Sequence, residues 1–594
     1  MDKPNPNRRQ FLRHLALGTT AVATAAGMSG CDDSITISFP QGVASGDPLA
    51  NAVLLWTRAY PSEDSTVSVT WEVASDAAFS APLASGAVTT SAARDYTVKV
   101  DVTGLLPGRT YYYRFKAGAS QSVVGRTRTL PAGATNQVKL AVFSCPNHPA
   151  GYFHVYAEAA KRDDLDAVLH LGDYIYEYGM GEYATEDAAA LGRVPVPAHE
   201  LYSLADYRAR YAQYRGDADL QALHARAPFI CVWDDHEVAN DAYTDGAENH
   251  NPGEGDYIAR RAAAAQAWYE WLPVREQDAA NPLITYRSFN FGDLLSLHML
   301  DTRHIGRDRQ LDYADYFDPS SGAFDSTAFT NDMGNPARQL LGQTQVNWLN
   351  ARLTGSSATW QVLGQQVLMG RMYLPSPLLT PDPQHPSVTF AEYGVIATAF
   401  VTYQTLAAQL TAAGTPVTPA NLIAAGMTAE QLAIVNDPAQ QAIIGAPSIP
   451  YNLDAWDGYA VARETVFGMA RGLDKNLVVL SGDTHNAWAN NLQDLSGNAV
   501  GVEFACSSVS SPGLEEYLPG TPPAELAAGV MQLIPTLKYA DTARRGYTLV
   551  TLSHAEARAD WYFVDTVKAT AYTPSLDKSL KTLPGAANRV LLAV

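Results

Sequence analysis

Four short apolar segments of this chain each run directly into side chains that can bind a metal ion. The segments are 138–143, 165–171, 229–233 and 477–481, and each has the length and composition of a buried strand. From residue 138 onward such segments alternate with helical patterns, which predicts an α/β architecture. Because ligands bind beyond the carboxyl ends of strands in sheets covered by helices, we expect the four ends to share one crevice.

The residues at these four ends form the candidate site. They are Cys145 after the first segment, Asp173 and Tyr176 after the second, Asp235, His236 and Asn240 after the third, and Asp483 and His485 after the last. We expect Tyr176 to lie one helical turn after Asp173, on the same side. An extended backbone is expected to place Asp483 and His485 on one face. A carboxylate and a phenolate together are a hard ligand set suited to Fe(III).

Each element of this site also has an ordinary structural interpretation. A single aspartate after a strand is more often a helix cap, a single buried histidine is more often a satisfied core residue, and the run at 234–237 fits an exposed acidic loop. A buried cysteine is by itself a small apolar side chain, which is the interpretation we favour for Cys231 and Cys506. For the run at 234–237 we favour metal or phosphate contact over the exposed loop. The combination of all these elements, with every motif position filled, favours a metal site.

Composition argues against two other classes of protein. Hydrophobic residues make up 47% of the chain and charged residues 17%, as in a folded globular protein, so disorder is not expected. The formal net charge of −20 argues against a nucleic-acid-binding module, because phosphate backbones are bound by clustered lysine and arginine. An acidic enzyme that acts on phosphates needs local cations, and bound metal ions supply them.

Residues 1–31 have the features of a targeting segment. Asn-Arg-Arg-Gln-Phe-Leu-Arg at 7–13 resembles a twin-arginine signal, and the apolar stretch at 15–28 is too short and too rich in Ala, Gly and Thr to span a membrane. Residues 28–31 also resemble a lipobox with Cys31 as the lipidated residue, and ordinary cleavage nearby is the alternative. We therefore expect the twin-arginine export machinery as a partner and a periplasmic or extracellular location, with membrane contact only through a lipid anchor at Cys31.

The remaining organisation follows from composition and periodicity. Residues 38–131 predict a small all-β domain, in which a Pro-Gly turn leading into Tyr111 resembles the tyrosine corner of fibronectin type III-like sandwiches. The catalytic domain is expected over 138–565. A Pro- and Ala-rich insertion at 374–450 is interpreted either as a cap or as a plain surface insertion. Residues 566–594 are expected to form a C-terminal tail.

Taken together, the motifs resemble the PhoD family of alkaline phosphatases, which belongs with the calcineurin-like and purple acid phosphatase group. The resemblance covers most of 38–373 and 451–565. The motifs that carry it are Ser-Cys at 144–145, Leu-Gly-Asp-Tyr-Ile-Tyr-Glu-Tyr at 171–178, Trp-Asp-Asp-His-Glu at 233–237, Leu-Asp-Thr-Arg at 300–303, Ala-Trp-Asp-Gly-Tyr at 455–459 and Ser-Gly-Asp-Thr-His at 481–485.

The resemblance implies a fold and a set of cofactors. The fold is an α/β metallophosphatase sandwich, with two mixed β-sheets flanked by helices, behind the fibronectin type III-like domain. The cofactors are one Fe(III) and nearby Ca²⁺ ions. By position, the implied iron ligands are Cys145, Asp173, Tyr176 and His485. Asp173 is then expected to bridge to calcium, and the implied further oxygen ligands are Asp235, Asn240 and Asp483.

The resemblance also implies an activity. This is hydrolysis of phosphate monoesters, diesters or both by a metal-activated water that attacks phosphorus in line. His236 is expected to protonate the leaving alkoxide or to stabilise the transition state. Arg303 is expected either to fork onto phosphate oxygens or to form a structural salt bridge. Phospholipids or cell-wall phosphodiester polymers are an alternative substrate class, and a non-catalytic surface-binding lipoprotein is the remote alternative.

Overall fold

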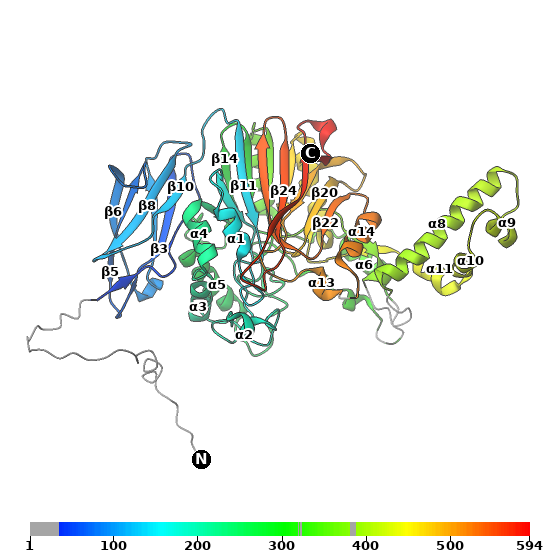
Figure 1. Ribbon diagram of the computed structural model, residues 1–594, viewed down its shortest axis with the longest axis horizontal. Coiled ribbons are helices and arrows are strands. Elements are labelled where there is room, and N and C mark those ends of the chain that lie inside the picture. Colours follow the sequence, from blue (N-terminus) through cyan, green and yellow to red (C-terminus); the bar gives the residue numbers. More distant parts are fainter. Residues whose placement is uncertain (1–34, 319, 321–323, 380–387, 519) are drawn as a thin grey trace, which may run out of the picture.

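Two large mixed β-sheets pack face to face in the computed structural model, which describes residues 35–318, 320, 324–379, 388–518 and 520–594 (Figure 1). The targeting segment and Cys31 lie outside the described residues. The core between the sheets takes buried side chains from both, among them Val142, Ile230, Leu297 and Val478. This arrangement confirms the predicted α/β sandwich.

Parallel strands form the centre of both sheets. In the first sheet β11 (Gln137–Phe143), β12 (Ala167–His170) and β13 (Phe229–Cys231) are parallel neighbours, and β23 (Arg545–Ser553) pairs antiparallel with β11. In the second sheet the parallel run is β15 (Leu295–Met299), β16 (Trp360–Gly364), β19 (Leu477–Ser481) and β21 (Ala499–Ala505). Its antiparallel members are β14 (Arg287–Phe291), β20 (Ala487–Gln493) and β22 (Leu537–Asp541).

Helices cover the outer faces of the two sheets, and their buried side chains form two further apolar clusters. The first sheet is covered by α1 (His154–Ala160), α3 (Leu204–Tyr214), α4 (Ala218–Arg226) and α5 (Tyr257–Trp271). The second is covered by α7 (Gly342–Gly355), α12 (Ala460–Gly472) and α14 (Pro523–Leu533). Short elements include α2 (Ala188–Leu191), α6 (Ser326–Met333), α13 (Leu514–Tyr517), β1 (Ile37–Ser38) and β4 (Tyr60–Pro61).

The N-terminal β region contains a five-stranded sheet of its own. Its strands are β5 (Val67–Ala74), β6 (Pro82–Thr90), β8 (Thr110–Ala117), β9 (Ser120–Gln121) and β10 (Gly125–Arg128). The Tyr111 hydroxyl accepts a hydrogen bond from the backbone N–H of Leu106 at 2.8 Å, as expected for a tyrosine corner. This all-β region precedes the α/β sandwich, as predicted.

The other N-terminal strands join the catalytic domain directly. The strands β2 (Val43–Gly46), β3 (Ala52–Arg58) and β7 (Thr97–Thr103) extend the first large sheet, because β2 pairs with β13 through Gly46 and Phe229. A Cβ atom on Gly46 would lie 2.7 Å from the Phe229 carbonyl oxygen, so only glycine permits this approach. Asp47 and Arg287, both buried, form an ion pair at 2.7 Å across the junction. The first sheet is therefore shared by the two regions.

The C-terminal segment is also part of the first sheet. The strand β25 (Pro574–Thr582) pairs antiparallel along β24 (Ala557–Val564), and β26 (Leu592–Ala593) pairs with β25. The expectation of a tail after residue 565 therefore differs from the structure. Pairing of β25 satisfies backbone groups that an open β24 edge would leave exposed.

The insertion forms a helical arm that projects away from the sheets (Figure 1). Its base is a two-stranded ribbon of β17 (Tyr373–Pro375) and β18 (Ser448–Pro450). The helices of the arm are α8 (Phe390–Ala412), α9 (Pro419–Ala424), α10 (Ala429–Asn436) and α11 (Pro438–Gly445). A capping box between Thr389 and Glu392 starts α8. Among the described residues, no helix combines the length and apolarity needed to cross a bilayer.

Candidate metal centre

The carboxyl ends of β12, β13 and β19 converge on one pocket, and Cys145, which follows β11, lies within 4.8 Å of ligand atoms of Asp173 and His485 in its wall. Its volume is about 350 Å³, and its lining includes side chains that follow β12, β13 and β19. The lining residues that were predicted from the sequence are Asp173, Asp235, His236, Asn240, Asp483 and His485. Residues from both large sheets thus contribute to one site, although they are separated by more than three hundred positions in the chain.

The potential ligand atoms of these residues form three overlapping groups. Within each group the atoms lie within 4.8 Å of one another. The groups are Cys145, Asp173 and His485; Asp173, Asp235 and His236; and Asp234, Asp235 and Asp483. Because Asp173 and Asp235 each belong to two groups, the arrangement is suited to adjacent cations that share carboxylate ligands.

Left-handed backbone conformations occur at four of the predicted positions. The φ angles are +60° at Cys145, +52° at Asp173, +64° at Asp483 and +61° at His485. The backbone at 483–485 is therefore not extended, which corrects the sequence-based expectation. Non-glycine residues rarely adopt such angles, at a cost of about 1–3 kcal/mol each, and they cluster at functional sites. Here the strain lies at the strand ends that bring the candidate ligands together.

Tyr176 reaches the same centre without a helix. Residues 171–178 form bends rather than the expected helical turn. The Tyr176 hydroxyl nevertheless donates a hydrogen bond to Asp173 Oδ2 at 3.0 Å, and lies 3.1 Å from His485 Nε2. Ser511 Oγ donates to the same hydroxyl at 2.7 Å. The prediction that Tyr176 and Asp173 lie together is correct, although its geometric reason was wrong.

The electrostatics of the pocket favour a bound cation. Burial raises the pKa of Asp173 and of Asp483 well above the usual range, and neighbouring carboxylates raise it further. Burial likewise raises the pKa of the Cys145 thiol. Burial lowers the pKa of His485 to about 3, so its imidazole is neutral, which is the form that binds metals. A cation would therefore stabilise the ionised thiol and carboxylates.

Several carboxylate oxygens at the centre lack hydrogen-bond donors. Asp173 Oδ1, Asp234 Oδ2 and Asp235 Oδ1 are buried and accept no hydrogen bond in the described part of the chain. Buried polar atoms are almost always paired, so the Asp173 and Asp234 oxygens indicate a missing electropositive partner, whereas Asp235 Oδ1 has the Arg303 guanidinium 3.5 Å away. Oxygen, nitrogen and sulfur donors of this kind fit transition-metal and calcium ions.

His236 is held by a glutamate that the sequence analysis did not single out. Its Nδ1 lies 2.7 Å from Glu177 Oε2, and both side chains are buried. Burial by itself lowers the pKa of His236, but Glu177, Asp235 and Asp173 outweigh it and raise the pKa well above its usual value. Glu177 also accepts the backbone N–H of Asn240 at 2.7 Å, which orients the loop that carries Asn240.

A second buried glutamate joins two of the converging loops. Glu237 accepts hydrogen bonds from the backbone N–H groups of Asp173 at 3.0 Å, Tyr174 at 2.6 Å and Asp234 at 2.7 Å. It therefore links the end of β12 to the end of β13. In the sequence, these two residues could have been found from their positions in the motifs. Glu177 lies within the motif at 171–178, and Glu237 lies within the motif at 233–237.

Arg303 lies beneath the centre, fully buried. Its Nε donates to Asp234 Oδ1 at 2.5 Å and its Nη1 to Asp454 Oδ1 at 2.7 Å. Its Nη2 lies 3.5 Å from oxygens of Asp235 and Asp483. Of the two roles left open by the sequence, this geometry favours the structural salt bridge over a fork onto phosphate.

The remaining cysteines fit the apolar role expected for them. Cys145, Cys231 and Cys506 are all buried and none forms a disulfide. Cys506 Sγ lies 3.4 Å from Ser144 Oγ, within the core between the sheets. Only Cys145 belongs to one of the ligand groups.

Comparison with known proteins identifies the family. The PhoD-like phosphatase model matches residues 140–561, and the model of the PhoD-like phosphatase N-terminal domain matches residues 25–131. The chain belongs to the PhoD-like phosphatase family. It is 34% identical over 533 residues to alkaline phosphatase D of Bacillus subtilis (strain 168), an alignment that covers 85% of this chain and 76% of that protein.

A solved structure of PhoD has the same fold. It matches with a TM-score of 0.72 and 31% identity, and the match covers 94% of this chain and 92% of that one. Membership of the PhoD-like phosphatase family identifies this chain as a phosphoric ester hydrolase.

Proposed function

We propose that this PhoD-like phosphatase hydrolyses phosphate esters at a centre of adjacent cations, Fe(III) and Ca²⁺. The observation that carries the proposal is that Asp173 and Asp235 each belong to two of the three ligand groups. His236 also belongs to one of these groups, but its proposed role is to hold a proton and not a metal ion. The residues that would hold iron are Cys145, Asp173, Tyr176 and His485. Those that would hold calcium are Asp173, Asp235, Asn240 and Asp483. When bound, these cations would hold phosphoryl oxygens and lower the pKa of water at the site.

The role proposed for His236 is to hold a proton beside the reacting group. The side chain lines the pocket, and its Nδ1 faces the buried Glu177 carboxylate. This carboxylate is not part of the ligand groups, so it continues to favour the imidazolium when Asp173 and Asp235 bind cations. A protonated imidazole at this place is suited to protonate the leaving alkoxide or to stabilise negative charge on phosphorus.

Arg303 and Glu237 are proposed to keep the ligands in place. Arg303 lies 3.5 Å from oxygens of the proposed ligands Asp235 and Asp483. Glu237 accepts the backbone N–H of Asp173 at 3.0 Å. Neither residue is required to contact substrate in this arrangement. Such outer contacts orient metal ligands in many metalloproteins.

The test is turnover of p-nitrophenyl phosphate and bis-p-nitrophenyl phosphate by the purified protein and by Asp173→Asn. Loss of an outer contact typically lowers activity by roughly 10–100-fold. We expect turnover by Asp173→Asn to fall by more than this, because the substitution removes a ligand that two groups share. The matched control is Asp278→Asn, which changes an exposed loop aspartate. Undiminished turnover by folded Asp173→Asn would overturn the proposal.

We also propose that the protein is exported through the twin-arginine pathway. The support is the Arg8-Arg9 pair followed by an apolar stretch and the residues before Cys31. Replacement of Arg8 and Arg9 by lysine is expected to retain the protein in the cytoplasm, measured by cell fractionation. Equal export of the unmodified protein and of this variant would contradict the proposal. Labelling of cells with a radioactive fatty acid separately tests the lipid anchor at Cys31.

A further inference from the structure

One buried arginine of this chain has no hydrogen-bond acceptor. Nine arginines are buried among the described residues: Arg193, Arg210, Arg215, Arg260, Arg287, Arg303, Arg307, Arg463 and Arg589. The side chains of eight of them donate to a carboxylate or to backbone carbonyls. Arg215 is the exception, because its Nε, Nη1 and Nη2 are all buried and have no hydrogen-bond partner in the described chain.

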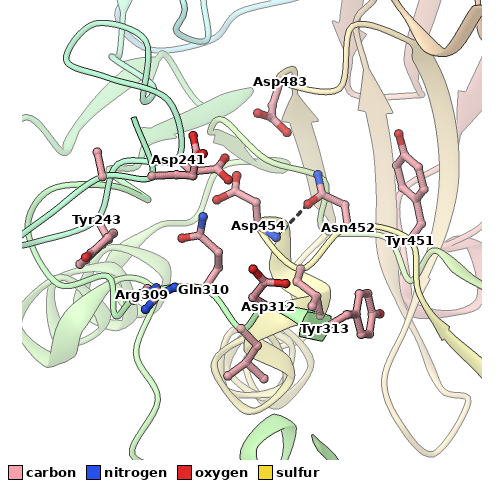
Figure 2. Close-up of a pocket in the computed structure, with 14 residues that line it drawn as sticks. Asp241, Tyr243, Arg309, Gln310, Asp312, Tyr313, Tyr451, Asn452, Asp454 and Asp483 are labelled. Carbon is pink, nitrogen blue, oxygen red and sulfur yellow. Dashed lines mark hydrogen bonds between the residues drawn. The ribbon is translucent and has the colours of Figure 1, made fainter. Parts of the chain in front are cut away.

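The usual pairing is seen in a second cavity, which adjoins the metal pocket. This cavity has a volume of about 550 Å³ (Figure 2). The residues that line both spaces are Asp241, Tyr451, Asn452 and Asp483. In its wall, Asp454 accepts a hydrogen bond from Arg303 at 2.7 Å and also pairs with Arg307. These two guanidinium groups therefore have an anionic partner within the protein, which Arg215 lacks.

Arg215 lies where the N-terminal strands meet the helices of the α/β sandwich. It follows α3, and in Figure 1 both α3 and α4 lie beside β3. Its guanidinium carbon is 4.2 Å from the ring centroid of Trp56 on β3, and both side chains are fully buried. A stacked guanidinium is planar and its N–H groups lie in that plane, so the indole ring beneath does not serve as their acceptor.

The groups near Arg215 do not supply a negative charge. Asp217, two residues along the chain, pairs with Arg193 at 2.9 Å. The hydroxyls of Ser45 and Tyr113 are buried and also have no hydrogen-bond partner in the described part of the chain. Burial raises the pKa of the Tyr113 hydroxyl more than Ser45 and Arg215 lower it, so this hydroxyl keeps its proton.

Tyr174 and His224 on the same side are neutral as well. Arg215 lowers the pKa of the Tyr174 hydroxyl, which burial raises, and this hydroxyl lies 2.7 Å from His224 Nε2. Burial lowers the pKa of His224 well below its usual value, and Arg215 lowers it further. One hydroxyl can accept at most two of the five guanidinium N–H groups. A permanent positive charge is therefore buried among neutral groups, which is costly unless an anion accompanies it.

We propose that a monovalent halide ion, chloride in ordinary buffers, binds beside the Arg215 guanidinium and accepts its N–H groups. Ser45 and Tyr113 supply hydroxyl donors near the same charge. A single negative charge balances the single positive one, whereas a phosphate dianion would leave a net negative charge in a fully buried place. Arg215 belongs to none of the metal-ligand groups, so this inference does not depend on the proposed hydrolysis.

Crystals of the unmodified protein grown with sodium bromide as the only halide test the site directly. An anomalous difference map recorded at the bromine absorption edge is expected to show a peak in contact with the Arg215 guanidinium. Density there without an anomalous signal would identify water and overturn the inference. Bromide found at surface positions alone is an adventitious ion only, and this result overturns the inference too.

Thermal unfolding tests the same site in solution. Replacement of gluconate by about 0.15 M chloride, at constant ionic strength, is expected to raise the Tm of the unmodified protein by about 2 °C, because the ion binds only the folded chain. Arg215→Met keeps a long side chain against Trp56 and removes the charge, so its Tm is expected not to respond. The control Arg352→Met changes an exposed arginine on α7 and is expected to respond like the unmodified protein.

The two measurements cover each other. An equal response of Tm to chloride in Arg215→Met and in the unmodified protein would overturn the inference, because the response would then not arise at Arg215. If Arg215→Met does not fold, the bromide map of the unmodified protein decides alone. Turnover of p-nitrophenyl phosphate is not a readout of either measurement, so neither result bears on the proposed function.

Discussion

Glu177 and Glu237 contact the candidate site residues from outside the pocket and orient them. Both are fully buried or nearly so, and their contacts run to His236 and to the backbone at Asp173. A sequence identifies such residues poorly, because a glutamate inside a motif looks the same whether it binds a metal or orients a neighbour. The candidate ligands themselves were predictable, since each follows a short apolar run.

Glu177→Gln tests the role of this outer contact. The amide keeps the volume but removes the charge that favours a protonated His236, so kcat/KM for p-nitrophenyl phosphate is expected to fall by roughly 10–100-fold. Steady-state kinetics measure this, with thermal unfolding as the check on folding. The control is Glu430→Gln on α10, in the arm. Kinetics indistinguishable from the unmodified protein would show that Glu177 is not needed to position His236.

Among single-residue features, the left-handed turns were not predictable. Asp483 and His485 have φ angles of +64° and +61°, although neither residue type requires such a conformation. The strain is compensated by surrounding contacts, including the bond between His485 Nδ1 and the Pro512 carbonyl at 2.7 Å. Those contacts come from distant parts of the chain, so residue type and spacing alone do not reveal them.

At the level of secondary-structure elements, the apolar strands were predictable and their long-range pairing was not. The strand β2 reaches β13 through a single pair, Gly46 with Phe229, which are far apart in the sequence. The strand β25 has only two buried side chains and gives no apolar run, so it was interpreted as a tail. The hydrophobic pattern of a sequence indicates which side chains are buried. Pairing at the edge of a sheet instead depends on backbone N–H and C=O groups, which nearly every residue has, so the sequence pattern does not reveal it.

Gly46→Ala tests the junction between the N-terminal strands and the catalytic domain. The new Cβ would lie 2.3 Å from the Pro273 carbonyl oxygen, so the free energy of unfolding is expected to fall by about 1–3 kcal/mol. Denaturant unfolding measures this. The control is Gly468→Ala on α12, which has open space for a Cβ and is not expected to lose stability. Equal stability of the two variants would contradict the close approach at Gly46.

At the scale of the whole molecule, the site and the arm are separate. The described helices α8 to α11 contribute no lining residue to either cavity, whereas Tyr451 and Asn452, directly after β18, line both. Of the two interpretations of the insertion, the structure favours a surface insertion over a lid. The sequence predicted that an insertion was present but not its direction, because weakly amphipathic helices carry little information about where they pack.

Replacement of residues 376–447 by an Asn-Gly turn tests this separation. The turn joins β17 to β18 directly, so the residues after β18 keep their place. We expect kcat/KM for p-nitrophenyl phosphate to remain that of the full chain. A large fall in kcat/KM with a folded catalytic domain would instead identify the arm as part of the active site.

Phosphoester hydrolysis is proposed to require adjacent cations held at four strand ends, and elemental analysis of purified protein tests this most directly. The unmodified protein is expected to contain a transition metal at about one equivalent together with calcium, and Asp173→Asn is expected to lose metal and turnover together. Full phosphoesterase activity in protein from which a chelator has removed all iron, other transition metals and calcium would contradict the account.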